Sequence, residues 1–76
     1  MDENQIKFKN NWDFIVYENN EKMIISVVFF NSFSDHSKSF VLNEDEKKYS
    51  FEQFKTLAEQ IRNNYESYKL REIPEL

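Results

Sequence analysis

The 76-residue chain contains no glycine, and this absence limits how its turns can be built. Average usage would place about five glycines in a chain of this length. Asparagine is the common substitute because it tolerates the left-handed backbone of tight turns. The pairs Asn10-Asn11 and Asn19-Asn20 are therefore expected to form two hairpin turns. Without glycine the chain also lacks glycine-rich phosphate loops and dinucleotide-binding fingerprints.

Apolar residues around these turns predict antiparallel strands over about 5–9, 12–18 and 22–30, and a fourth strand over about 38–42. A two-residue second turn would pair Val16 with Met23, Phe14 with Ile25 and Trp12 with Val27. These six side chains would share one face of the sheet.

A helix is expected over about 51–68. Ser50 and Gln53 have the spacing of a capping box, and Tyr49 and Phe54 that of a hydrophobic staple. Apolar residues recur every three or four positions, at Phe51, Phe54, Leu57, Ala58, Ile61, Tyr65 and Tyr68. The other side is expected to face solvent, with Glu52, Lys55, Glu59, Arg62, Asn63 and Glu66. A short strand over 70–73 would precede Pro74.

These elements predict one domain over residues 1–76, of α+β class and two layers. An antiparallel meander of about four strands would carry one C-terminal amphipathic helix on the face of Trp12, Phe14, Val16, Ile25 and Val27. The opposite face would stay open. Its apolar members are Ile15, Tyr17, Ile24, Val28 and Phe30.

An open apolar face of that size indicates a binding surface for a partner or a second copy. Two alternatives remain. The N-terminal strand and the loop containing Phe33 could fold over this face, or a register shifted by one residue would exchange the two faces.

The sequence lacks the residues that several kinds of catalysis require. The chain has no cysteine and one histidine, which excludes disulfides, thiol nucleophiles and a histidine-only zinc site. Ser34, Asp35 and His36 are neighbours in one expected loop, so they cannot adopt the relayed geometry of a hydrolytic triad. Neither an enzyme nor a cofactor or metal site is expected.

The net charge of −4 favours a positively charged protein partner and disfavours nucleic acid. Glu44, Asp45 and Glu46, with Asp35, would form an acidic edge that steers such a partner. The structural alternative is that acidic residues ahead of Ser50 interact with the positive end of the helix dipole. The acidic start Met1-Asp2-Glu3-Asn4 is unlike a secretory signal, and the apolar runs are too short to span a bilayer, so cytoplasmic residence without membrane contact is expected.

The short acidic meander, the stretch ISVVFFNSFSDHSKSFVLNEDEKKYSFEQFKTLAEQI and the single amphipathic helix together resemble small bacterial immunity proteins of polymorphic toxin systems. The layout is similar to the MafI partners of MafB toxins. The resemblance implies that the chain neutralises a cognate toxin, an EndoU-like ribonuclease in the MafB case. It carries no residue-level motif. The alternative is a small homodimeric structural or regulatory module of phage or plasmid origin.

Overall fold

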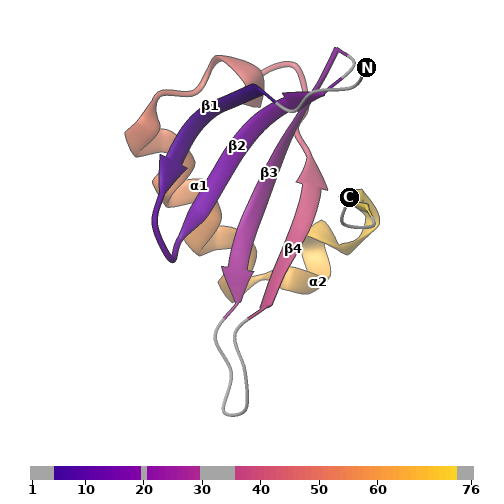
Figure 1. The fold of residues 1–76 in the computed structure, drawn as a ribbon. Coiled ribbons are helices and arrows are strands. Elements are labelled where there is room, and N and C mark those ends of the chain that lie inside the picture. The colour runs from indigo at the N-terminus through magenta and orange to yellow at the C-terminus, as the bar shows by residue number, and fades with distance from the viewer. Residues whose placement is uncertain (1–4, 20, 30–35, 74–76) are drawn as a thin grey trace.

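The five strands of the described residues form one antiparallel sheet in the order β1-β2-β3-β4-β5, so each strand pairs with its neighbour in sequence (Figure 1). The computed structural model describes residues 5–19, 21–29 and 36–73. The strands are β1 (Gln5–Asn10), β2 (Phe14–Asn19), β3 (Lys22–Phe29), β4 (His36–Val41) and β5 (Glu72–Ile73). The helical elements are η1 (Glu46–Lys48), α1 (Phe51–Asn63), α2 (Tyr65–Tyr68) and η2 (Lys69–Arg71).

The predicted α+β class is confirmed, with a helical layer on one face of the sheet. Figure 1 shows α1 lying across the sheet behind the strands. Its buried residues pack against those of the sheet in one cluster that contains Phe14, Val16, Ile25, Val27, Phe40, Leu42, Phe54, Leu57, Ala58 and Ile61. Burial of this apolar surface is the main stabilising contribution. None of the described helices is both long and apolar enough to cross a membrane.

The pairing of β2 with β3 differs from the predicted register by two residues. Phe14 lies opposite Val27 and Val16 opposite Ile25. A shift of two residues keeps every side chain on its predicted face, because side chains alternate with a period of two. The predicted core face is therefore right for these four residues, although the predicted cross-strand partners are wrong.

Trp12 is the exception on that face. The first turn occupies three positions between Asn10 and Phe14, which are paired, so β2 begins two residues later than predicted. Trp12 lies within this turn with a φ of 65° and three quarters of its surface, 75%, exposed. The prediction that it contributes to the core is wrong because the chain turns before it enters the strand.

The start of α1 follows the predicted pattern. The Ser50 hydroxyl accepts a hydrogen bond from the Gln53 backbone, and the Gln53 side chain accepts one from the Ser50 N–H. The rings of Tyr49 and Phe54 lie 5.6 Å apart, as the staple requires. The capping box and the staple are both confirmed.

The helix ends earlier than predicted. It stops at Asn63, and α2 follows after Asn64, whose φ of −133° and ψ of 45° are not helical. The Gln60 carbonyl accepts hydrogen bonds from both the backbone N–H and the side chain of Asn64, so this residue caps the C-terminal end of α1. Tyr65 and Tyr68 still pack against the core from α2.

Candidate functional site

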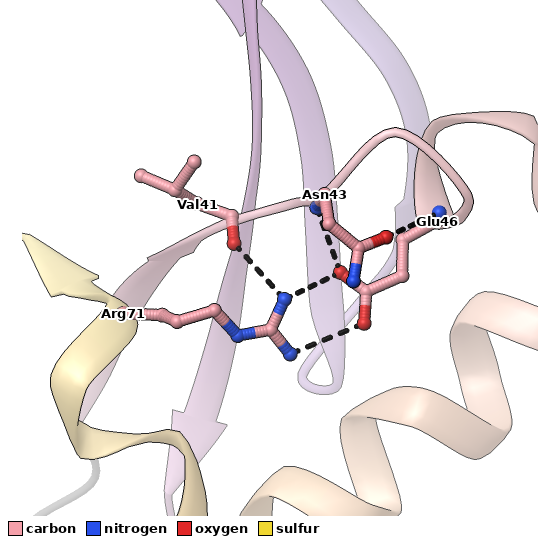
Figure 2. A network of polar contacts seen from close by, with 4 residues as sticks. All are labelled: Val41, Asn43, Glu46 and Arg71. Atoms are coloured by element: carbon pink, nitrogen blue, oxygen red, sulfur yellow. Dashed lines mark hydrogen bonds and ion pairs between the residues drawn. The ribbon is translucent and has the colours of Figure 1, made fainter.

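Glu46 lies in η1, within the connector between β4 and α1 (residues 43–48), and forms a bidentate ion pair with Arg71 of η2 (Figure 2). Arg71 Nη1 lies 2.7 Å from Glu46 Oε1 and Nη2 lies 3.1 Å from Oε2. The Asn43 N–H also donates to Oε1, and the Asn43 side chain accepts from the Glu46 N–H. Hydrogen bonding to Glu46 raises the pKa of Arg71 above its ordinary value. This geometry holds the connector against the end of the sheet.

The connector 43–48 does not form the expected acidic edge. Glu46 is only 6% exposed and its carboxylate is directed at Arg71, so the expectation that it lies on an exposed acidic edge is wrong. Glu44 and Asp45 are exposed as expected. Glu44 pairs with Lys47 at 3.0 Å, and Lys48 is exposed in the same turn. The two remaining acidic side chains are therefore opposed by two nearby lysines.

Charge is balanced across the part of the chain that the structure describes. All 10 Lys and Arg residues lie within it, together with all of the 14 acidic residues except Asp2, Glu3, Asp35 and Glu75. The negative excess of the sequence thus arises from residues outside the described part, and the described surface has no net charge to steer a cation. Asp35, a predicted partner residue, belongs to this excess.

The second face of the sheet is less accessible than predicted. Tyr17 is 8% exposed and Ile24 is 3% exposed, so the expectation that these two side chains lie open to solvent is wrong. Ile15 and Val28 are partly exposed, and Phe30 lies outside the described residues. Tyr17 and Ile24 are directly paired across β2 and β3. Both fall on the predicted face, but neither side chain is open to solvent.

Arg62 connects α1 to the opposite layer, although the helical pattern placed it in solvent. Its Nε donates to the Val28 carbonyl at 2.6 Å, and its Nη2 donates to the Asp13 carbonyl at 2.7 Å and to the Asp13 carboxylate. Both side chains of the ion pair are largely buried. The expectation of a solvated Arg62 is wrong because its long side chain turns inward at the end of the helix.

The turn that contains Trp12 is held in place by hydrogen bonds of the next residue, Asp13. The Asp13 N–H donates to the Asn10 carbonyl at 3.0 Å, and the Asn10 side chain donates to the Asp13 carboxylate at 2.8 Å. The Asp13 carbonyl also accepts from the Val28 N–H at 2.9 Å. Residues of β1, β3 and α1 thus converge on the residue next to Trp12. In the sequence, the spacing of three residues between Asn10 and Asp13 is the signal that could indicate this hydrogen bond, because Asn and Asp side chains often bond within a turn.

Strand β1 is the long outer edge of the sheet. It pairs only with β2, and its register shifts between Ile6 and Phe8, so Lys7 occupies a bulge. Ile6 is 59% exposed on this edge, while Phe8 packs against Phe54 on the core face with ring centres 5.3 Å apart. The third strongly exposed large apolar residue of the described part, Leu70, is 99% exposed and belongs to η2.

Contacts within the fold also involve His36, Lys38, Tyr65 and Glu72. His36 stacks on Phe29 with ring centres 6.1 Å apart. The Tyr65 hydroxyl donates to Glu72, which raises the pKa of Tyr65, and Glu72 also pairs with Lys38 at 3.6 Å.

Within the described ranges no group of three metal-ligating side chains lies together. An open hollow of about 340 Å³ runs beside α1, between Tyr49 and Gln60.

The chain matches no protein-family model, no curated protein and no solved structure.

Proposed function

We propose that this chain binds another protein and inhibits it in the cytoplasm, as an immunity protein neutralises its toxin. The observation that carries the proposal is that β1 and the turn after it each present an exposed large apolar side chain. Ile6 and Trp12 are two of the three large apolar residues that are strongly exposed in the described part. We call Ile6, Lys7, Lys9 and Trp12 the β1 surface.

Strand β1 suits recognition by another protein because none of the described strands pairs with its outer side. An unpaired edge can accept an extended segment of a second chain, with side chains supplying the specificity. Lysines and bulges at an edge discourage indiscriminate pairing. Lys7 occupies the bulge and Lys9 is exposed further along the strand. These features favour one complementary partner over general self-association.

We propose a basic protein as the partner because the whole chain carries a net charge of −4, and the excess acidic residues that would attract it lie outside the described part of the chain. The toxin of the proposal is a cationic nuclease, and inhibition requires only that binding covers or distorts it. Because the described surface is balanced in charge, apolar contact supplies most of the affinity. The homodimer alternative was placed on Ile24 and Val28, of which Ile24 is buried and Val28 is partly exposed.

The test uses the tagged chain as bait in a lysate of its native host, washed at low and at moderate salt. We expect one basic protein to be retained in stoichiometric amount and to be toxic when expressed alone. Co-expression of the wild-type chain should restore growth, and the variant Ile6→Asp should not. The matched control is Leu70→Asp, which changes an exposed apolar residue away from the β1 surface and should protect as well as the wild type.

Two results would contradict the proposal. One is retention of the bait alone, with a sedimentation mass twice that of the monomer. The other is a retained protein whose activity is the same with and without the chain.

A further inference from the structure

Trp12 combines three properties that the stability of this fold does not explain. It is the sole tryptophan of the sequence, it is 75% exposed, and its φ is 65°. A bulky residue in the left-handed region is sterically strained. The exposed indole gains little packing in return. Strain of this kind is often retained at sites that bind other molecules.

The backbone under Trp12 is held in place. Asp13, the next residue, bonds to Asn10, Val28 and Arg62 from three different elements. A side chain on a fixed backbone loses little conformational entropy when a partner immobilises it. Tryptophan is enriched among the few residues that contribute most of the binding free energy of a protein–protein interface.

We infer that Trp12 is a pre-organised anchor that enters an apolar pocket of the partner protein, and that the Asp13–Arg62 ion pair positions it. This inference rests on the proposed function. The pocket must accept a flat bicyclic ring and offer one hydrogen-bond acceptor to the indole Nε1–H. A flat or purely polar partner surface does not meet this requirement.

Trp12 variants test the anchor with the basic protein that the wild-type bait retains. Trp12→Asn should weaken binding by about 30-fold or more, the loss typical of a central binding residue. Asparagine tolerates a positive φ, so this variant should melt no lower than the wild type. Trp12→Phe should retain part of the affinity, and Leu70→Asn should bind within about twofold of the wild type.

Fluorescence gives a second measurement because Trp12 is the sole tryptophan. Emission of the free chain should be that of an exposed indole, and it should shift to shorter wavelength when the basic protein is added. The anisotropy of the free chain should report a rigid turn, and Arg62→Gln should lower that anisotropy while also weakening binding. A purely structural role of Arg62 would not change the mobility of the indole in molecules that remain folded.

The outcomes separate the inference from the proposed function. If the bait retains no basic protein, both are overturned. If Ile6→Asp abolishes binding and Trp12→Asn binds like the wild type, only the anchor is overturned. A shift of emission on adding phosphatidylcholine or phosphatidylglycerol vesicles, with none on adding the basic protein, would assign Trp12 to a lipid surface and overturn the inference.

Discussion

The carboxylate of Asp13 binds the guanidinium of Arg62 across 49 positions of the sequence, and this pair joins the end of α1 to the turn between β1 and β2. The same guanidinium also satisfies the Val28 carbonyl. One side chain thus fixes the relative position of the two layers at this end of the molecule.

Replacing Arg62 with methionine should lower the free energy of unfolding by about 2–4 kcal/mol. The change leaves the Asp13 carboxylate and two carbonyl groups without their donor in a largely buried site. Urea denaturation measures the loss. Lys55→Met, on the outward side of α1, is the control and should change the stability by less than about 0.5 kcal/mol. Equal stability of the two variants would contradict a structural role for Arg62.

The Glu46–Arg71 pair should show strong energetic coupling. In a double-mutant cycle of Glu46→Gln and Arg71→Met, we expect a coupling free energy of about 1–2 kcal/mol, because the pair is two-pronged and Glu46 is buried. The corresponding cycle on Glu44 and Lys47 should give less than about 0.5 kcal/mol, since Glu44 is 87% exposed. Similar values for the two cycles would show that burial does not strengthen the Glu46 pair.

Glu21 offers a stabilising substitution. Its φ is 69°, a conformation that disfavours glutamate more than asparagine or glycine. Glu21→Asn should raise the stability by about 0.5–1 kcal/mol, which corresponds to a few degrees in melting temperature for a chain of this size. Lys22→Asn, one residue later and within β3, should instead lower it. A drop in melting temperature for Glu21→Asn would exclude strain at this turn.

The Tyr65 hydrogen bond to Glu72 should make the fold sensitive to alkaline pH. This bond is the main cause of a tyrosine pKa above the ordinary 10.0, so the folded state holds the phenolic proton more tightly than the unfolded state. The stability it contributes is fully present below pH 10.0 and decreases as the pH rises through the folded-state pKa. Tyr65→Phe should remove this part of the pH dependence.

The measurement is the unfolding midpoint as a function of pH, together with the phenolate absorbance of wild type and variant. Tyr68→Phe is the control, because Tyr68 stacks against Arg71 and does not bind Glu72. Identical alkaline profiles for the wild type and Tyr65→Phe would count against the hydrogen bond.

The sequence predicted the faces of the sheet better than its pairings. Alternation assigns Phe14, Val16, Ile25 and Val27 to the core in either of two registers that differ by two residues. The position of the turn decides between these registers: Asn19 still pairs with Lys22, so the turn lies one residue later than the predicted turn at 19–20. A glycine-free chain lacks the usual signature that marks this position. Alternation assigns Trp12 to the core because the apolar pattern extends to this residue. In the structure Trp12 lies in the turn between Asn10 and Phe14, where alternation no longer applies.

The charged residues were harder to predict from sequence. Arg62 and Glu46 stand in patterns typical of solvated positions, and their partners are 49 and 25 positions away. A single sequence contains no local signal for such pairings. The capping box at Ser50 was predictable because its two members lie three residues apart. Of the predicted partner residues, Glu44 and Asp45 remain exposed and Ile15 and Val28 partly so.

The two arginine pairs join segments that are 49 and 25 positions apart, and they do so only in the folded state, whereas a covalent crosslink would also constrain the unfolded chain. The sequence has no cysteine, so no disulfide accompanies these ion pairs. The folded state should therefore have the same stability with and without a thiol reductant. A domain built in this way should keep the same structure in oxidising and in reducing surroundings.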